Sequence, residues 1–183
     1  VLMLHIPRAG RLGDPVNIAE MIELNRKYPK VKTIIAHIGR AYADGDVGDA
    51  FERLEEAPGL IFEFSANCNG NVMEKMIRSV GPKRIIHGSD SPILRMRMGR
   101  TVENGTYINL VPPGMYGDPS QDPHLREVSA EEAEKITFFA YEELLAFKRA
   151  CQTLGCSRQD IEDMMYNNAM NLIEGARKDI YGE

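Results

Sequence analysis

The sequence predicts an α/β fold built on a parallel β-sheet. Four short runs, at residues 1–6, 33–38, 60–65 and 84–86, are almost continuously apolar, which is typical of strands that are buried on both faces of a parallel sheet. Helical patterns separate these runs, and such alternation implies parallel strands joined by right-handed crossovers. The pattern alone fits either a closed barrel or an open doubly wound sheet.

The helices between the strands carry their own start and stop signals. Asp14 and Pro15 supply an N-cap and a first-turn proline for a helix that ends near Tyr28. A second helix is predicted over about 46–57. A third covers 72–80, with Gly81 placed to end it.

The organisation changes after Asp90. Residues 91–126 are rich in proline and show no clear period, and connections of this length are usually functional loops or disordered. Two helices then follow within 129–175: one opens with the capping box Ser129 and Glu132 and runs to about Leu154, and the other begins at Ser157. We expect residues 1–183 to form one domain.

Composition limits the classes of partner. The chain has 183 residues and a formal net charge of −5, with no basic stripe, so we expect neither nucleic acid nor a membrane as its partner. No apolar run has the roughly 20 residues of a membrane helix, and no signal peptide is recognised. The first residues already read as a strand, so we expect part of the fold to lie upstream. Three cysteines without a metal-binding spacing, Cys68, Cys151 and Cys156, favour reduced thiols in a cytoplasmic protein.

Polar residues follow three of the apolar runs at the point where each run ends. The residues are His5, His37 and Asp90. In α/β folds chemistry collects at the carboxyl ends of parallel strands, so we expect these side chains to converge. Two imidazoles and a carboxylate suit a divalent ion such as zinc or manganese, which activates bound water. Alternatively, each histidine is a core residue and the aspartate only forms a turn.

Other polar residues carry weaker signals. Arg8 and Arg40 follow the histidines closely and are candidates to bind an acidic substrate group. The alternative for both is a surface salt bridge. For Arg11 the salt bridge is the favoured interpretation. His87 reads as a packing residue or a support for the site, and His124 as an exposed loop residue.

Two sets of glutamates raise the question of whether their side chains are buried or exposed. Glu63 lies within a strand, where it is either buried with a partner or turned to a wet edge. The glutamates of the predicted C-terminal helix, Glu142 and Glu143 among them, are interpreted as its solvated face.

Three segments resemble the amidohydrolase-2 family of the amidohydrolase superfamily. The KYPKVKTIIA stretch before His37-Ile38-Gly39-Arg40 is similar to the family's "KYP…K.I.AH.G" segment. RIIHGSDSP at 84–92 resembles "RILFGSDYP", with His87 where an aromatic residue is usual. The segment at 166–172 looks like the closing "NA.RLL" helix.

The resemblance implies a metal-dependent TIM-type barrel, of which about four βα units are present, as strands five to eight, plus C-terminal helices. It implies His5 and Asp90 as metal ligands and His37 and Asp90 as catalytic acid/base groups. The cofactor would be a divalent metal, zinc first and manganese second, and residues 91–126 would lie on the substrate side.

One departure from the family pattern limits these expectations. The family's first strand carries an HxH pair of ligands, and none of the four histidines here forms one. We therefore expect a hydrolase or lyase for a small carboxylated or cyclic molecule, inactive as the 183-residue chain alone and homo-oligomeric. The alternative is a non-catalytic half-barrel or open-sheet binding module.

Overall fold

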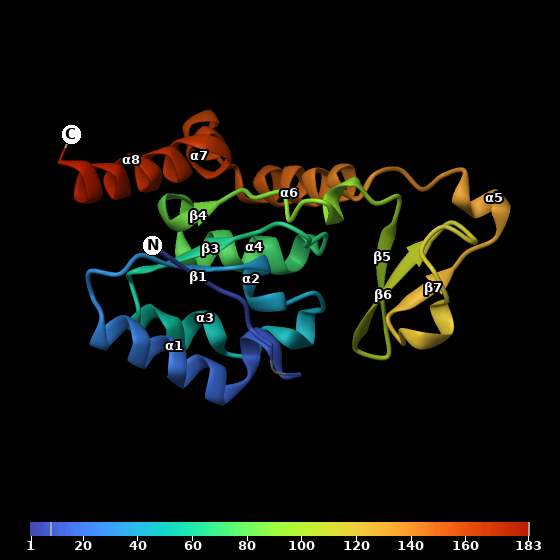
Figure 1. Ribbon diagram of the computed structural model, residues 1–183, viewed down its shortest axis with the longest axis horizontal. Coiled ribbons are helices and arrows are strands. Elements are labelled where there is room, and N and C mark those ends of the chain that lie inside the picture. Colours follow the sequence, from blue (N-terminus) through green and yellow to red (C-terminus); the bar gives the residue numbers. More distant parts are fainter. Residues whose placement is uncertain (8, 183) are drawn as a thin grey trace.

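The computed structural model describes residues 1–7 and 9–182. At its centre lies a four-stranded sheet in the order β1-β2-β3-β4, with every neighbouring pair parallel (Figure 1). The α/β prediction and the parallel sheet are confirmed. The strands are shorter than the apolar runs, because the last residues of each run leave the sheet and form the loops at its carboxyl edge: β1 is Leu2–Leu4, β2 Thr33–Ile35, β3 Leu60–Glu63 and β4 Ile85–Ile86.

The helices between these strands begin close to their sequence signals. The Asp14 carboxylate accepts hydrogen bonds from the backbone N–H groups of Val16 and Asn17, which caps the first helix as predicted. The second predicted helix, over 46–57, is not continuous, because short 3-10 turns flank a single α-helical turn. The bounds are α1 Pro15–Lys27, α2 His37–Arg40, α3 Ala50–Arg53 and α4 Gly70–Val80, with 3-10 turns at Arg11–Gly13, Asp44–Asp46, Leu54–Glu56 and Pro82–Arg84.

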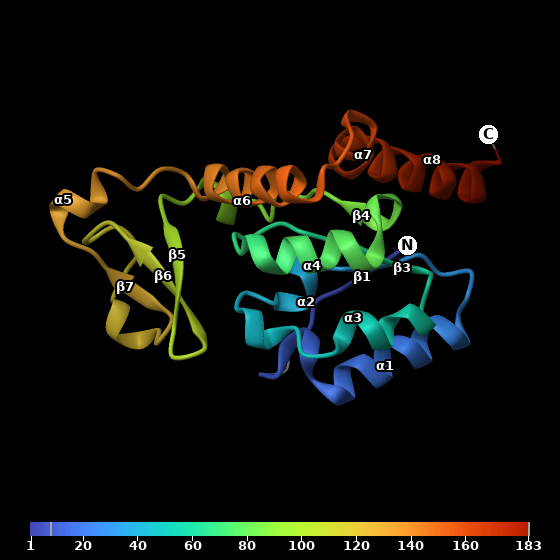
Figure 2. The same cartoon turned by 180° about the vertical axis from the view of Figure 1, so that it is seen from behind.

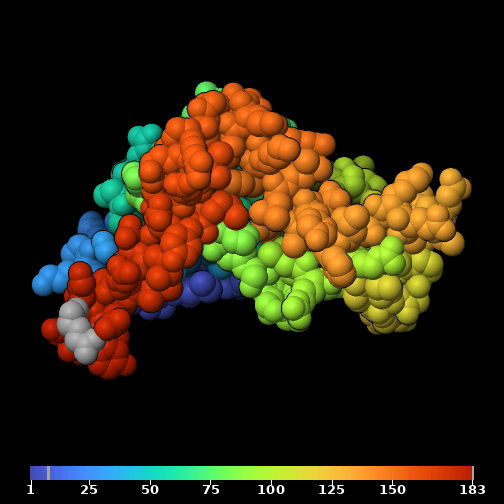
Figure 3. Space-filling view, turned by 90° about the horizontal axis from the view of Figure 1, so that it is seen from above, coloured from blue at the N-terminus to red at the C-terminus, as the bar shows by residue number. Residues whose placement is uncertain are grey.

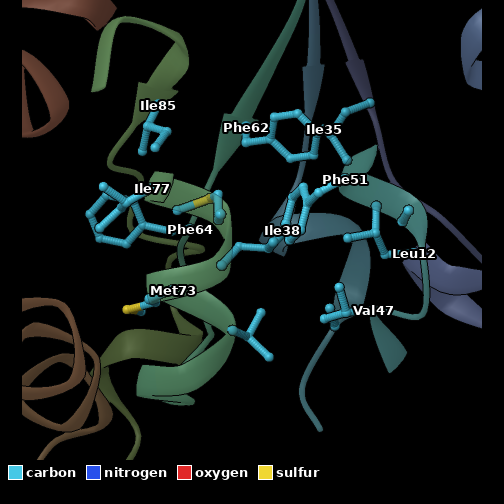
Figure 4. Close-up of a cluster of buried hydrophobic side chains, with 14 of the residues drawn as sticks. Leu12, Ile35, Ile38, Val47, Phe51, Phe62, Phe64, Met73, Ile77 and Ile85 are labelled. Carbon is cyan, nitrogen blue, oxygen red and sulfur yellow. The ribbon is translucent and has the colours of Figure 1, made fainter. Parts of the chain in front are cut away.

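The main core fills the space between the sheet and these helices. Aromatic and aliphatic side chains from strands and helices interdigitate there, as Figure 4 shows for Phe62, Phe51 and Ile35. Phe64, just after β3, stacks on Phe147 with ring centroids 4.8 Å apart, which attaches helix α6 (Phe139–Leu154) to the sheet. Because these apolar side chains are buried against the helices, the alternate side chains of each strand point away from this core.

The segment after Asp90 contains a second sheet rather than an irregular loop. Strands β5 (Gly99–Glu103) and β6 (Thr106–Val111) form an antiparallel hairpin, and β7 (Leu125–Glu127) adds to β6 in parallel. The expectation of an irregular 91–126 is therefore wrong. This small sheet lies beyond the main sheet in both Figure 1 and Figure 2, next to the loops that follow β2 and β3.

The C-terminal helices differ from the prediction at one break. Residues 129–154 form α5 (Ala130–Ala133) and α6 (Phe139–Leu154), because Phe138 is extended and bridges Arg97. The Arg97 guanidinium donates to the carbonyls of Ala133 and Ile136, at the end of α5 and in the segment that follows it. Then α7 (Arg158–Glu162), a π-helical turn at Asp163–Asn167 and α8 (Asn168–Tyr181) complete the chain, and α6 and α8 cover one side of the molecule in Figure 3.

The outer edge of β4 is covered by the C-terminal segment. The backbone N–H of His87 donates to the carbonyl of Met164, and the amide of Asn168 donates to the carbonyls of Ile85 and Pro82. Since β1 and β4 are the two ends of the strand order, the sheet of the described residues is open rather than closed into a barrel. Within residues 1–7 and 9–182, no helix is long and apolar enough to cross a membrane.

Candidate functional site

His5, His37 and Asp90 come together beyond the carboxyl ends of the strands. The imidazole rings of His5 and His37 lie 5.2 Å apart, edge to face. The Nε2 atom of His37 lies 4.0 Å from Oδ1 of Asp90. His5 is exposed, Asp90 is partly exposed and His37 is buried. One rim therefore carries all three side chains that the sequence singled out, and we refer to them as the rim triad.

The backbone that carries His37 is strained. His37, Ile38, Gly39 and Arg40 all have positive φ values between 51° and 61°, so α2 is a left-handed turn rather than an ordinary helix. For residues other than glycine this conformation costs about 1–2 kcal/mol each. Gly39 is required for a further reason, because a Cβ there would lie 2.8 Å from the Leu12 side chain. Strain of this kind persists where surrounding contacts fix it, and it is concentrated at functional sites.

The buried carboxylate of Glu63 provides those contacts. Its Oε2 accepts a hydrogen bond from the backbone N–H of His37 at 3.0 Å, and its Oε1 accepts one from the N–H of Ser65 at 2.5 Å. A Cβ on Gly88, which follows β4, would lie 2.5 Å from Oε1 of Glu63, so a larger residue there has to shift the carboxylate. Of the two alternatives for Glu63, burial with partners is the one observed.

Ser65 and Glu63 also fix the orientation of the His37 ring. The Nδ1 atom lies 3.2 Å from the carbonyl oxygen of Ser65, 3.0 Å from its hydroxyl and 3.5 Å from Oε2 of Glu63. A carbonyl only accepts hydrogen bonds, so this arrangement favours a proton on Nδ1. The lone pair of the neutral ring then lies on Nε2, the atom that faces Asp90.

His5 favours its neutral form. Partial burial, and after it the neighbouring His37 and Arg40, lower the pKa of His5, and the carboxylate of Asp90 opposes this effect. Asp90 itself, in the loop that follows β4, has a positive φ of 41°. Thus two of the rim triad, His37 and Asp90, are presented on strained backbone.

Comparison with known proteins identifies the family. A family model described as amidohydrolase matches residues 1–174. The chain belongs to the amidohydrolase-2 family. No curated protein and no solved structure gives a match.

Members of the amidohydrolase family typically bind divalent metals, and the rim triad contains side chains of the kinds that bind such ions. A neutral imidazole at His5 and a carboxylate at Asp90 are donors of the kind that zinc and manganese accept. In residues 1–7 and 9–182, however, no three His, Cys, Asp or Glu side chains are arranged to bind one ion. The rim of this amidohydrolase fits a metal in the type of its donors, and it supplies only part of a complete ligand set.

The arginines near the rim have different partners. Arg40 donates from Nη1 to the carbonyl of Ile6 at 3.3 Å, next to the rim triad. Arg11 forms an ion pair of 2.7 Å with Asp46, so the salt-bridge interpretation holds for this residue. Arg8, predicted to bind substrate, lies outside the described residues.

One buried carboxylate was misassigned from the sequence. Glu143 is completely buried in α6 and is not part of a solvated helix face. Its Oε2 accepts a hydrogen bond from the N–H of Ala66, and its Oε1 lies 3.1 Å from Nε2 of His87. His87 thus supports the loop after β3 indirectly, through Glu143, which binds the N–H of Ala66. This agrees with the interpretation of His87 as a support for the site. Burial raises the pKa of Glu143, and the contact with His87 opposes this.

His124 and a cavity at the other end of the sheet lie away from the triad. His124 is not simply an exposed loop residue, because its ring stacks on Tyr107 with centroids 4.2 Å apart. A cavity of about 560 Å³ lies between α8 and the amino ends of the strands, lined by Lys30, Lys83 and Ile86 among others. Because it is at the opposite end of the sheet, it does not contain the rim triad.

Proposed function

We propose that this amidohydrolase-2 chain carries the carboxyl-terminal half of a metal-dependent active site that acts as a hydrolase or lyase. Within the proposal the four strands correspond to strands five to eight of a TIM-type barrel. The substrate is a small carboxylated or cyclic molecule. The protein is cytoplasmic and homo-oligomeric, and neither nucleic acid nor a membrane is its partner.

The convergence of the rim triad supports this proposal. Three polar side chains from three different strand ends meet at one rim, with His37 and Asp90 4.0 Å apart. A set of unrelated core histidines and turn-forming aspartates has no reason to converge in this way. The strained backbone under His37 gives the same indication, because such strain accumulates where a side chain has to be aimed.

His5 and Asp90 are the proposed metal ligands, with zinc as the first choice and manganese as the second. A metal of this type, when bound, lowers the pKa of a coordinated water to about 7 and polarises a substrate oxygen. The exposed ring of His5 is accessible to an incoming ion. A zinc ion usually has about four ligands, so the further ligands of the ion have to come from groups other than His5 and Asp90.

His37 and Asp90 are the proposed acid/base groups. With Nδ1 held by Ser65, the Nε2 lone pair of His37 accepts a proton on the side of Asp90. The 4.0 Å separation of Nε2 and Oδ1 is longer than a direct hydrogen bond, so both atoms keep a free site for a reacting group. Buried Glu63 accepts the backbone N–H of His37 and lies 3.5 Å from its Nδ1. Its negative charge therefore stabilises the imidazolium that forms when Nε2 of His37 accepts the proton.

Arg40 and Arg8 are the proposed substrate-binding residues. The guanidinium of Arg40 donates to the main-chain carbonyl of Ile6 at 3.3 Å, interacts with the Tyr42 hydroxyl, and lies close enough to His5 to lower its pKa, with no carboxylate among these partners. Such a group can pair with a carboxylate of the substrate. The assignment of Arg8 rests on its position in the sequence, three residues after His5.

Cobalt(II) titration of the purified chain tests the metal assignment, because its visible absorption reports ligand exchange even for weak binding. We expect an absorption change in the wild type that is lost in H5Q and in D90N. The control is H124Q, which changes a histidine that stacks on Tyr107 away from the rim. H37N tests the separation of roles, and we expect it to retain cobalt binding.

Two results would count against the proposal. One is a wild-type titration identical to that of H5Q and D90N. The other is a cobalt spectrum that depends on His124 and is independent of the rim triad.

A further inference from the structure

Arg100, in β5, is a partly buried cation that has no carboxylate partner among the described residues. Its guanidinium carbon lies 4.2 Å from the ring centre of Tyr42 and 4.8 Å from those of Tyr107 and Phe139. Within residues 1–7 and 9–182 no carboxylate pairs with it, and its hydrogen bonds go to a main-chain carbonyl, that of Ala66, and to the side-chain amide oxygen of Asn109. Burying a charge in this way is costly unless something balances it.

The neighbouring arginine shows the contrast. Arg11 lies over the same Tyr107 ring at 4.8 Å, but Asp46 neutralises it at 2.7 Å. The ionisable groups close to Arg100 include the thiol of Cys68 and the phenol of Tyr42. Burial raises the pKa of Cys68 to about 11 and also raises the pKa of Tyr42, so both groups are neutral at pH 7. The positive charge of Arg100 is therefore left unbalanced.

Donor groups of Arg100 remain available for a ligand. A guanidinium has five N–H groups, and the two hydrogen bonds from Nε and Nη1 use two of them. Nη2 takes part in neither of these hydrogen bonds, and Arg100 is only partly buried. Nη1 and Nη2 together can form the forked bond that a carboxylate accepts.

Arg100 is joined to the rim through consecutive residues. The carbonyl of Ser65 contacts Nδ1 of His37, and the carbonyl of the next residue, Ala66, accepts the hydrogen bond of Arg100. Ala66 has a positive φ of 54°, which marks a sharp change of direction at this point. Tyr42, the ring nearest to Arg100, follows the left-handed turn by two residues and neighbours Arg40. The second sheet thus brings a cation to the loops that hold His37.

We propose that Arg100 is an anion-binding residue of this rim, and that it binds a carboxylate of the substrate between the two sheets. The inference rests on the proposed function in that the ligand is taken to be the substrate. It adds a specificity determinant supplied by the β5–β7 insertion. The competing role is structural, with Arg100 only attaching the second sheet to the loop after β3.

Binding of benzoate, with benzamide as a neutral molecule of the same shape, distinguishes the two roles. We expect benzoate, and not benzamide, to shift the Nε–H resonance of Arg100 in a two-dimensional ¹⁵N–¹H NMR titration of the 183-residue chain. R100Q is expected to weaken benzoate binding about ten- to hundredfold, the range for losing a hydrogen-bonded charge, and R100K less. The control is R97Q, because the Arg97 guanidinium is in the same insertion and binds the carbonyls of Ala133 and Ile136.

The outcomes separate clearly. Equal shifts from benzoate and benzamide, no shift with benzoate, or equal loss of binding in R100Q and R97Q would overturn the proposal. The wild-type comparison of the two probes needs no variant, so a failure of R100Q to fold leaves the test intact. Cobalt binding at His5 and Asp90 is measured independently of Arg100, which keeps this result apart from the metal assignment.

Discussion

Glu63 is the buried carboxylate on which the geometry of His37 depends, and E63Q is the most informative single change. The carboxylate accepts two backbone N–H groups, from His37 and Ser65. Glutamine keeps one acceptor oxygen and places an NH₂ group against the other N–H. One charge-assisted hydrogen bond contributes about 1.5–3 kcal/mol, and the buried N–H left without a partner costs about 1–3 kcal/mol more.

The left-handed turn increases the effect of this change. His37, Ile38 and Arg40 have positive φ values, which at about 1–2 kcal/mol per residue amount to roughly 3–6 kcal/mol of strain. Without the anchor at Glu63 the turn relaxes, which returns part of this strain and limits the net loss of stability. We therefore expect E63Q to lower the free energy of unfolding by about 2–4 kcal/mol, out of the roughly 5–15 kcal/mol typical of a domain.

Urea denaturation followed by circular dichroism measures this difference, and the His37 ring resonances report whether the turn relaxes. The matched control is E55Q, the same substitution at an exposed glutamate of the 3-10 turn Leu54–Glu56. A loss below about 0.5 kcal/mol in E63Q, the usual range for surface changes, would refute the anchoring role. So would unchanged His37 resonances together with a large loss of stability.

Three further predictions follow from buried groups. G88A is expected to lower the free energy of unfolding in urea by about 1–3 kcal/mol, because the added methyl group meets Glu63 at 2.5 Å. An unchanged free energy of unfolding would contradict this prediction. Burial raises the pKa of Cys151 to about 12, so about one thiol in ten thousand is ionised at pH 8, and mass spectrometry should find Cys151 alkylated by iodoacetamide only after unfolding. Since burial raises the folded-state pKa of Glu143 above the unfolded value of 4.5, its stabilising contribution is complete below pH 4.5 and is lost as the pH rises through the folded value. E143Q should therefore gain stability relative to the wild type between pH 4 and pH 8 in paired melts, and a fall over that range would contradict the assignment.

The sequence was sufficient for the main sheet and for the choice of rim residues. Buried parallel strands produce continuous apolar runs, and their ends place His5, His37 and Asp90 without knowledge of the loops. The orientation of His37 was not predictable in this way, because it depends on Glu63 and Ser65 across two strands.

The second sheet had a signal that was missed. Asn104 and Gly105 both have positive φ and join β5 to β6, and Asn-Gly between strands is a strong hairpin signal. The pairing of β7 with β6 is distant in sequence and leaves no such mark.

The burial of Glu143 was also readable from helix spacing. Phe139, Ala146, Phe147 and Ala150 form the buried face of α6, and Glu143 falls four residues after Phe139 on that same stripe. Interpreting every glutamate of a helix as solvated overlooked this position. At the break between α5 and α6, Phe138 bridges Arg97, which precedes β5 and is distant in sequence, so local propensity contained no sign of this contact.

The covered edge of β4 limits how this sheet can be extended. A strand arriving beside Ile85 and His87 meets backbone groups that are already satisfied by Asn168 and Met164. Addition on that side has to displace the C-terminal segment first, whereas β1 has no strand on its outer side in the described residues. Of the two outer strands, β1 is therefore the one beside which a further strand can pair without displacing Met164 and Asn168.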